Sequence, residues 1–433
     1  MSGKGEKVVL VGGGGREHAI ARSLAGDVEL FNVAKNRNPG IERLARGYEP
    51  LDPTNTEAVI AFAESVDASM AVVGPEAPLE AGIVDACSAR GIFAFGPTAA
   101  NARIETDKGF QRHFMREHDI PGCPAFSVLE DVEAACAAID QADHDLAVKP
   151  AGLTGGKGVK VIGDQVSKAE AKSYLRAEQP ERIVLEERLL GEEFTVQAIV
   201  ANGAVRTTPA VQDHKRAFAG DEGPNTGGMG SYSDTGSLLP FMEKDDYRTA
   251  TQILESTVEA LDDFTGILYG QFMCTESGVS VIEFNARFGD PEAMNTLSVL
   301  ETPFVNILRA AREGRSLPEL SFAPLATVCK YAVPTGYPSD PHAGTPVSIP
   351  SDLPDGADLF FASVDARKDG IYTTTSRSLA VVGVGDSIER AEAKVSSAFS
   401  RIGETGLHIR HDIGTAELVA ERVEHMHQLR GGT

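Results

Sequence analysis

The stretch LAVKPAGLTGGKGVKVIG, residues 146–163, decides the fold. Two short apolar runs flank a glycine-rich segment, which predicts a strand, a loop and a second strand. The segment 152–158 is not a Walker loop, because Ala151 stands where that loop needs its first glycine and Gly158 where it needs Ser or Thr. A glycine flap that carries Lys157 can still cover phosphate groups, since no Cβ atoms obstruct its backbone N–H groups.

Two further lysines accompany this flap. Lys149 stands on the strand before it, and Lys108 begins a helical pattern over residues 107–119. Only 14 of the 40 basic residues are Lys, so three lysines around one flap are more than chance readily supplies. We therefore expect a phosphate-binding site here; the alternative is a hairpin turn with solvated lysines.

Residues 266–285, GILYGQFMCTESGVSVIEFN, predict a β-hairpin. The alternation of its second strand places Glu283 and Asn285 on one face. Residues 276–278 fit a three-residue hairpin loop, which sets Gln271 opposite Glu283. One carboxylate and two amide oxygens suit Mg²⁺ that also binds nucleotide phosphates. An ordinary polar sheet face is the alternative.

The segment RFGDPE, residues 287–292, follows the hairpin directly. Arg287 is positioned to hold an anionic substrate or a charged transition state. Asp290 either contacts substrate or caps the turn before Pro291.

The first hundred residues alternate β-like runs with helical segments. The runs lie at 7–11, 28–34, 70–73 and 91–97. This spacing predicts a parallel sheet with helical crossovers, which makes a Rossmann-like α/β unit.

The first of these runs leads into GGGG, residues 12–15, before a helix. Exposed N–H groups at such a junction bind anions, and Arg16 adds a bidentate donor. Glu17 stands where the dinucleotide fingerprint needs glycine, which disfavours a nicotinamide cofactor. A sugar phosphate is the preferred ligand, and a plain tight turn is the alternative. Glu76 follows the third run, at the sheet edge where ligands bind, or else in an exposed turn.

We divide the chain into three units. These are a Rossmann-like domain at 1–103, a central region at 104–318 with a lid near 123–190, and a small α/β domain at 326–433. Within the central region, GDEGPNTGGMGSYS at 220–233 shows no apolar period and is predicted to be a long loop.

The composition limits the class of protein. The net charge is −23, from 63 acidic and 40 basic residues, which opposes nucleic-acid binding and anionic membranes. No apolar stretch approaches the roughly 18 residues of a membrane span. Five cysteines without a C-x-x-C pattern predict reduced thiols and a cytoplasmic location. An acidic, lysine-poor surface suits concentrated salt, so we expect an extreme halophile as the source.

Together these motifs resemble the phosphoribosylamine–glycine ligase family, also called glycinamide ribonucleotide synthetases, of the ATP-grasp superfamily. The stretches that carry the resemblance occur in the family's order and are GGREHA (14–19), VGPEAPL (73–79), FGPT (95–98), GLTGGKGV (152–159), QDHKR (212–216), GPNTGGMGSYS (223–233) and VIEFNARFGDPE (281–292). The family often has Asn where Gly13 stands and Asp where Ala151 stands.

The resemblance implies an ATP-grasp fold of mixed α/β and α+β class, with ATP and Mg²⁺ or Mn²⁺ as cofactors. It implies an enzyme of purine biosynthesis, which we expect to act as a monomer. ATP would phosphorylate the carboxylate of glycine, and the amine of 5-phosphoribosylamine would attack the glycyl phosphate. The products would be glycinamide ribonucleotide, ADP and phosphate.

The resemblance also carries residue roles onto this chain. The nucleotide residues would be Lys108, Lys149, Gly155, Gly156, Lys157, Gly158, Glu187, Arg188, Leu189 and Glu193. The substrate residues would be Gly14, Gly15, Arg16, Glu17, Glu76, Asp213, His214, Lys215, Asn225, Thr226, Gly227, Gly228, Arg287 and Asp290. Lys149 and Arg287 would be catalytic, and Glu283 and Asn285 would bind the metal, with Gln271 added from strand register.

Three rival functions are open. One is another ATP-grasp ligase or carboxylase that acts on a purine intermediate. The second is a nucleotide-sensing protein without catalysis, and the third is a nicotinamide oxidoreductase.

Overall fold

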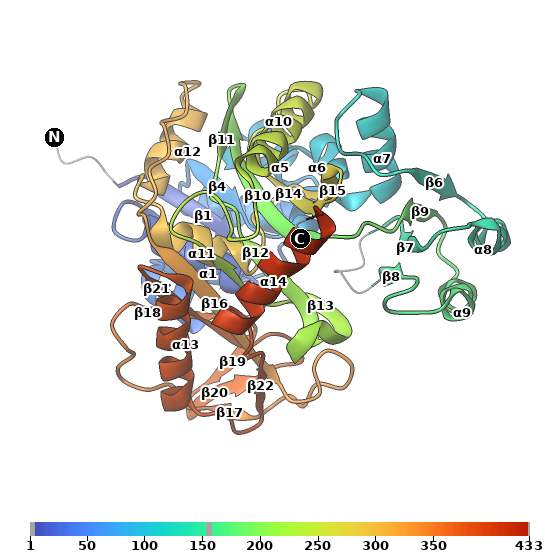
Figure 1. Cartoon of the computed structure of the whole chain (residues 1–433). Helices are drawn as coiled ribbons and strands as arrows, with labels where there is room; N and C mark the ends of the chain where they lie inside the picture. Colours follow the sequence, from blue (N-terminus) through green and yellow to red (C-terminus); the bar gives the residue numbers. More distant parts are fainter. Residues whose placement is uncertain (1–4, 153–157, 432–433) are drawn as a thin grey trace.

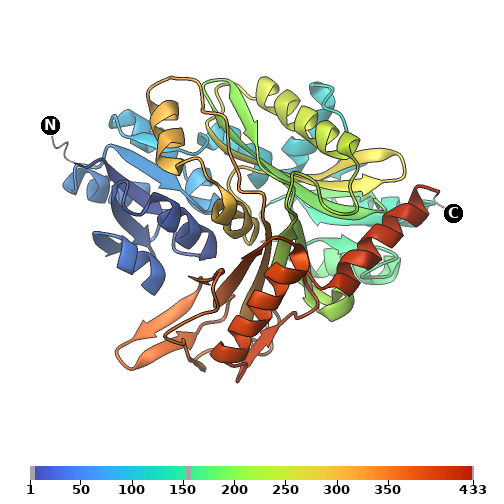
Figure 2. The same ribbon diagram turned by 60° about the vertical axis from the view of Figure 1, so that its left-hand side comes forward.

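The computed structural model describes residues 5–152 and 158–431 (Figures 1 and 2). Gly155, Gly156 and Lys157, which we expect to bind phosphate, lie outside the described residues. None of the helices within the described ranges is long and apolar enough to cross a membrane. Each of the five cysteines is a free thiol, as predicted.

The N-terminal sheet is parallel, which confirms the prediction. Its strands in spatial order are β3 (Gly47–Pro50), β2 (Glu29–Ala34), β1 (Lys7–Val11), β4 (Met70–Val73) and β5 (Phe93–Phe95). Its helices are α1 (Gly15–Leu24), α2 (Pro39–Leu44), α3 (Thr56–Ser65), α4 (Glu76–Glu80), α5 (Ile83–Ala89) and α6 (Ala99–Thr106). The chain order reverses direction between β1 and β4, so the loops after these two strands flank the crevice where ligands bind in such sheets.

A separate antiparallel sheet forms the lobe on the right of Figure 1. Its strands in order are β6 (Phe126–Leu129), β9 (Ile183–Glu187), β7 (Leu146–Pro150) and β8 (Lys160–Val161). Helices α8 (Val132–Gln141) and α9 (Lys168–Glu178) pack on it around a small apolar core of its own. Helix α7 (Lys108–Glu117) leads into this lobe.

A second antiparallel sheet faces this lobe. Its strands in order are β11 (Ala204–Thr207), β10 (Glu192–Ala201), β14 (Gly266–Thr275) and β15 (Gly278–Asn285). Helices α10 (Lys244–Ala260), α11 (Glu292–Val299) and α12 (Phe304–Arg312) follow or accompany it. Strands β7 and β9 of the lobe and strand β15 of this sheet supply the polar side chains of the candidate site.

The predicted three-residue hairpin loop is wrong, because Thr275 pairs with Gly278 and leaves a two-residue turn. A register shift further along nevertheless sets Gln271 opposite Glu283, the pairing we expected. The shift inserts Ile282 as an extra residue in β15, which is a β-bulge. Sequence alternation does not reveal this bulge, and it changes where the carbonyl of Ile282 points.

The predicted loop at 220–233 is also wrong. A short 3₁₀ turn, Ala219–Asp221, leads into strand β13 (Glu222–Ser233), which pairs with β12 (Gln212–Phe218) and with β16 (Ala326–Pro334). Glycine permits this close packing: a Cβ on Gly230 would lie 2.3 Å from the carbonyl oxygen of Cys329. Hydrogen bonds to the backbones of β12 and β16 therefore stabilise β13 as a strand, although its sequence has no apolar period.

The third sheet crosses the boundary that we expected between the central and C-terminal units. It continues from β12, β13 and β16 through β21 (Leu379–Gly385) to β18 (Ala357–Phe361), and β22 (Leu407–Ile409) pairs with β16. The remaining elements are a small sheet of β17 (Pro346–Val347), β20 (Gly370–Thr373) and β19 (Val364–Arg367), with helices α13 (Ile388–Ile402) and α14 (Ala416–Leu429).

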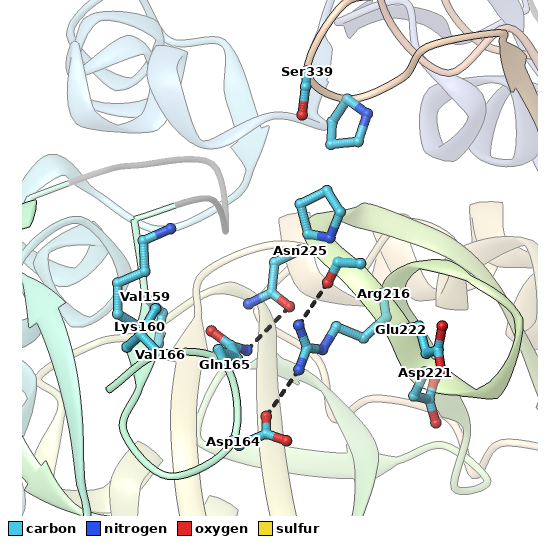
Figure 3. Close-up of a pocket in the computed structure, with 13 residues that line it drawn as sticks. Val159, Lys160, Asp164, Gln165, Val166, Arg216, Asp221, Glu222, Asn225 and Ser339 are labelled. Atoms are coloured by element: carbon cyan, nitrogen blue, oxygen red, sulfur yellow. Dashed lines mark hydrogen bonds and ion pairs between the residues drawn. The ribbon is translucent and has the colours of Figure 1, made fainter. Parts of the chain in front are cut away.

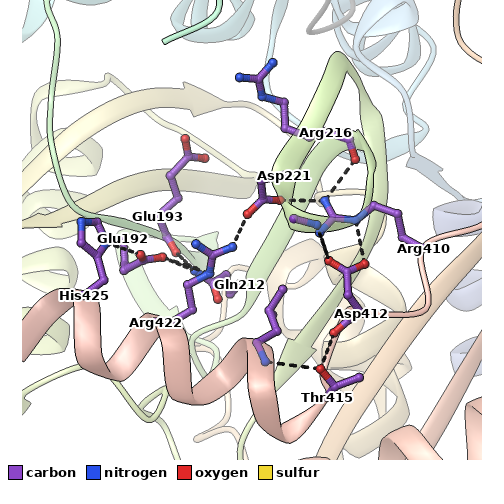
Figure 4. A network of polar contacts seen from close by, with 12 residues as sticks. Glu192, Glu193, Gln212, Arg216, Asp221, Arg410, Asp412, Thr415, Arg422 and His425 are labelled. Atoms are coloured by element: carbon purple, nitrogen blue, oxygen red, sulfur yellow. Dashed lines mark hydrogen bonds and ion pairs between the residues drawn. The ribbon is translucent and has the colours of Figure 1, made fainter. Parts of the chain in front are cut away.

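Charge pairs tie helix α14 to the central region (Figure 4). Arg422 contacts both Glu192 of β10 and Asp221, and the Nδ1 atom of His425 lies 2.5 Å from Glu192. Arg410, just ahead of the helix, donates to Asp221 at 2.7 Å. The C-terminal segment thus supports the outer side of strands β10 and β12.

Candidate active site

A buried cluster of two cations around one carboxylate lies where the lobe meets the second sheet. Nζ of Lys149 on β7 lies 2.6 Å from Oε2 of Glu186 on β9. Arg112 of α7 donates to both oxygens of Glu186, at 2.7 and 2.9 Å. Burial opposes ionisation of Glu186, but Arg112 and Lys149 outweigh it and hold its pKa at about 2. Lys149 is therefore held in place at the edge of the site, and burial lowers its pKa against the opposing charge of Glu186.

The bulge in β15 brings Glu283 to this cluster. The carbonyl of Ile282, freed from the strand ladder, accepts hydrogen bonds from Lys149 at 3.1 Å and Arg112 at 2.6 Å. Burial works against the charge of Glu283, but nearby lysines outweigh it and hold its pKa at about 2. Those lysines are Lys215, Lys108 and Lys149. The lysines that surround the Glu283 carboxylate are therefore placed to bind phosphate oxygens as well.

The three predicted metal residues lie together, but the amide oxygens of two of them already accept hydrogen bonds, and that of Asn285 accepts from Arg287 Nη2 at 3.4 Å. Asn285 Nδ2 lies 3.4 Å from Glu283 Oε1 on the same face of β15. Gln271 is occupied at both ends, since its oxygen accepts from Lys215 at 2.5 Å and its nitrogen donates to Glu193 at 2.6 Å. No group of three or more His, Cys, Asp or Glu suited to a metal occurs in the described ranges. Glu283 and Asn285 fit Mg²⁺ only with phosphate or water oxygens as further ligands.

Glu193 and Asp213 are acidic groups on the same side of the site. Burial raises the pKa of Glu193, and it raises that of Asp213 to about 7 against the charge of Lys215. Asp213 is 8 % exposed, and its Oδ1 atom has no hydrogen-bond partner among the described residues. Such a buried acceptor is costly unless a ligand satisfies it. Asp213 and Lys215 are both substrate residues by prediction.

Arg287 lies between two carboxylates of the N-terminal region. Its Nη2 atom is 2.9 Å from Glu105 Oε1, and its Nε atom is 3.6 Å from Glu76 Oε2. Burial opposes the charge of Arg287, but these two carboxylates outweigh it and raise its pKa. Its guanidinium is 6.0 Å from the ring centroid of Tyr269. The predicted residues Glu76 and Arg287, distant in sequence, are thus neighbours.

The glycine loop after β1 is held by Glu17. Its carboxylate accepts from the N–H group of Gly14 at 2.6 Å and from Arg16 at 2.6 Å. Arg16 also donates to the carbonyl of Phe288 at 3.1 Å, which ties this loop to the segment after Arg287. The predicted substrate residues Gly14 to Glu17 therefore adjoin Arg287.

Residues 226–228 and Asp290 meet in one place. The Thr226 hydroxyl donates to the carbonyl of Lys215 at 2.8 Å and accepts from the N–H of Gly228 at 3.0 Å. Arg377 donates to the carbonyl of Gly227 at 2.6 Å and pairs with Asp290 at 3.1 Å. Gly228 has φ +111°, a conformation that favours glycine.

The predicted adenine-side residues form the end of β9 and the segment after it. Glu187 accepts from the N–H group of Ala125 at 2.7 Å, and Arg188 pairs with Asp145 at 3.1 Å. Leu189 is half-buried. Lys108 donates to the carbonyl of Gly152 at 3.0 Å and so lies at the base of the flap. Gly158 is buried at the flap's other end.

Two predicted residues lie away from this centre. Asn225 lines a cavity of about 750 Å³ between the lobe, the β12–β13 hairpin and Pro338, where Gln165 donates to it at 3.4 Å (Figure 3). His214 lies on the face of β12 opposite Asp213 and Lys215, beside the Tyr232 ring. Burial holds the pKa of His214 at about 3, so it is neutral. The structure does not bring it to the substrate residues.

Three charged residues of the site escaped the sequence analysis: Arg112, Glu186 and Glu105. All three are nearly fully buried. The available signal for Glu186 was its place directly after the apolar run of IVLEE, since a charge buried in a strand requires a partner.

Comparison with known proteins identifies the family of this chain. Models of the phosphoribosylglycinamide synthetase family match the chain as an N domain at 6–105, an ATP-grasp (A) domain at 106–293 and a C domain at 327–416. The phosphoribosylamine–glycine ligases of Methanocella arvoryzae and Methanopyrus kandleri are 47 % and 48 % identical to it. Each match covers 98 % of this chain, and 100 % and 99 % of the relative respectively.

A crystal structure of phosphoribosylamine–glycine ligase from Thermotoga maritima superposes with a TM-score of 0.80 at 26 % identity, over 94 % of this chain and all of that one. The fold and the site define the ATP-grasp class. Within that class, the chain belongs to the phosphoribosylglycinamide synthetase family.

Proposed function

We propose that this protein is a phosphoribosylamine–glycine ligase, which joins glycine to 5-phosphoribosylamine in purine biosynthesis at the expense of ATP. The observation that carries the proposal is the position of Glu283. Its carboxylate lies in the field of Lys108, Lys149 and Lys215, between the lobe and the second sheet. Such a set of fixed charges suits the triphosphate of ATP.

Glycine is a zwitterion, and the site offers both charges that it needs. Arg287 suits the carboxylate, because a guanidinium pairs with it in bidentate fashion. Asp213 suits the ammonium group, because its buried Oδ1 atom has no hydrogen-bond partner within residues 5–152 and 158–431. Tyr269 links the two, since its ring lies by Arg287 and its hydroxyl donates to Glu292, an acidic neighbour of Asp213.

We assign Mg²⁺, or Mn²⁺ in its place, to Glu283 and Asn285. Hard oxygen ligands that leave positions open for phosphate oxygens suit these ions. The ion, when bound, neutralises charge on the phosphates during transfer. Gln271 becomes a ligand only if Lys215 releases its oxygen, so we place it second to the other two.

The ribosylamine phosphate suits the glycine loop at Gly14 and Gly15, at the N-terminus of α1. The helix dipole favours an anion there, together with the backbone N–H groups other than that of Gly14, which Glu17 already binds. Arg16 and Glu17 brace the loop, and Arg16 reaches the carbonyl of Phe288. With the phosphate bound there, we expect the amine to lie on the side of Arg287.

The reaction then has two steps. Lys149 and its neighbours orient ATP so that an oxygen of the glycine carboxylate takes the terminal phosphoryl group, and ADP is released. The ribosylamine nitrogen attacks the carbonyl carbon of glycyl phosphate, the carbon–oxygen bond to phosphate breaks, and the nitrogen gives up a proton. The lobe at 123–190 would shield the acyl phosphate from water on closing.

The test of this function is ADP release with each substrate omitted in turn. We expect full release only with glycine, ribosylamine and ATP together. A carboxylase would instead release ADP with bicarbonate and without glycine. A nucleotide sensor would bind ATP without glycine-dependent hydrolysis.

We also propose that the enzyme works in the cytoplasm of a salt-accumulating cell. The free thiols suit a reducing compartment, and the charge of −23 suits high salt, in which like charges are screened. The free energy of unfolding should rise between 0.1 M and about 2 M KCl. Full stability in dilute buffer would refute the halophilic assignment.

A further inference from the structure

Arg377 belongs to no motif that points to the reaction, yet it contacts two segments that do. It lies between β20 and β21 of the C-terminal region. Its Nη1 atom donates to the carbonyls of Gly227 at 2.6 Å, Gly228 at 3.2 Å and Asp290 at 2.9 Å. Its Nη2 atom pairs with Asp290 Oδ2 at 3.1 Å. One guanidinium thus fastens the 227–228 segment to the turn after Arg287.

A second contact continues from Asp290 to the N-terminal domain. The other oxygen of Asp290 accepts from the Tyr331 hydroxyl at 2.6 Å, and the Arg377 guanidinium stacks 4.5 Å from the Tyr331 ring centroid. Tyr331 stands on β16, and its hydroxyl oxygen lies 2.3 Å from where a Cβ on Gly15 would be. Arg377, Asp290 and Tyr331 therefore join β13 to the glycine loop; we call these three residues the triad.

The loops that the triad joins are tightly packed around it. A Cβ on Gly227 would lie 3.3 Å from the Arg377 guanidinium, and one on Gly228 would lie 2.7 Å from Pro291. Burial opposes the charge of Arg377, but Asp290 outweighs it and raises its pKa. The guanidinium stays charged and, being planar with several donors, it holds all its acceptors at once.

The triad adjoins the ribosylamine side of the site. It reaches Gly15 of the glycine loop, and none of the contacts that the structure describes for Arg377 involves Lys149 or Glu283. A displacement of the glycine loop would alter ribosylamine binding before it altered phosphoryl transfer from ATP.

We infer that Arg377 is a positioning residue for the ribosylamine half of the reaction, acting through Asp290 and Tyr331 on the glycine loop. The inference rests on the proposed function, because it presumes that ribosylamine binds at that loop. It assigns to the C-terminal domain a share of the substrate site.

The test separates the two half-reactions in Arg377→Ala and Arg377→Lys. Hydroxylamine replaces ribosylamine as the nucleophile and traps glycyl phosphate as the hydroxamate, which reports the first half-reaction alone. We expect hydroxamate formation within about twofold of wild type, and a KM for ribosylamine raised about tenfold or more in both variants. Arg367→Ala is the matched control, an exposed arginine of the same domain that pairs with Asp365.

A more conservative variant keeps the inference testable if the Arg377 variants fail to fold. Tyr331→Phe removes one hydroxyl from the triad, and its effect on the KM for ribosylamine should combine less than additively with that of Arg377→Ala. An unchanged KM in the Arg377 variants, or an equal loss of hydroxamate and ligation, would overturn the inference. Wild-type protein that forms neither hydroxamate nor ligated product would refute the proposed function itself.

Discussion

Lys149 and Glu186 lie diagonally across neighbouring antiparallel strands, with Nζ 2.6 Å from Oε2 and both side chains nearly excluded from water. Arg112 shares the same carboxylate. One negative charge thus serves two cations within this cluster. A phosphate group that enters would complete the pairing of Lys149.

Lys149→Ala should abolish most catalysis without loss of the fold. Glu186 keeps its bidentate partner Arg112, so no buried charge is left alone. We expect glycine-dependent ADP release to fall by about 10²-fold or more, since a cation aimed at the transferred phosphoryl group is lost. Lys172→Ala, a partly exposed lysine on α9 that pairs with Asp140, is the control. Near-normal turnover of the Lys149 variant would remove that residue from the mechanism.

Glu283→Gln should raise the concentration of Mg²⁺ needed for half-maximal activity by about tenfold or more. The change keeps the shape of the side chain but removes the charge that Lys108, Lys149 and Lys215 face. Glu276→Gln, at the exposed turn of the same hairpin, should leave the requirement as it is. An identical Mg²⁺ titration of wild type and the Glu283 variant would exclude a metal at this position.

Gly74→Ala should weaken ribosylamine binding. A Cβ at Gly74 would lie 2.1 Å from Glu17 Oε1, so the carboxylate that holds Gly14 must move. We expect the KM for ribosylamine to rise about tenfold while the KM for ATP stays constant. Gly236→Ala is the control, because a Cβ at that position would meet no atom within 4 Å among the described residues. Equal effects on both KM values would count against a ribosylamine site at the glycine loop.

His18 should make stability depend on pH. Burial holds its pKa at about 3, below the 6.5 of the unfolded chain, and its Nδ1 atom accepts from the N–H of Phe361 at 2.9 Å. The unfolded chain binds a proton below pH 6.5 that the folded chain does not. Wild type therefore loses stability as the pH falls from 6.5 towards 3, by about 1 kcal/mol per pH unit from this residue.

His18→Gln removes this titration and leaves the other ionisable groups in place. Denaturant unfolding between pH 7 and 4.5 should show the variant less stable at pH 7, with the gap closing as the pH falls. A gap that stays constant across this range would contradict a neutral His18 in the folded protein.

The sequence was sufficient to predict the helices and strands whose apolar residues repeat with a regular helical or strand spacing. The parallel sheet followed from the apolar runs at β1, β2 and β4, and helix α7 lies within the helical pattern predicted over residues 107–119. The pairing of Gln271 with Glu283 was also correct, but two deviations produced it, a shorter turn and a bulge at Ile282.

Features set by distant partners were not predictable from local pattern. Strand β13 has glycines instead of an apolar period, and pairing with β12 and β16 makes it a strand. Arg112 and Glu186 lie 74 residues apart and pair only after α7 and β9 pack together. His214 and Lys215 are adjacent in sequence, yet strand alternation sends them to opposite faces of β12.

We propose that the glycine carboxylate takes the phosphoryl group of ATP between Lys149 and Glu283. Glycine labelled with ¹⁸O in its carboxylate tests this directly, with mass analysis of the phosphate released during ligation. We predict one labelled oxygen in each phosphate, because the bond that breaks lies between the glycine carbon and that oxygen. Phosphate without label, formed alongside the ligated product, would contradict the account.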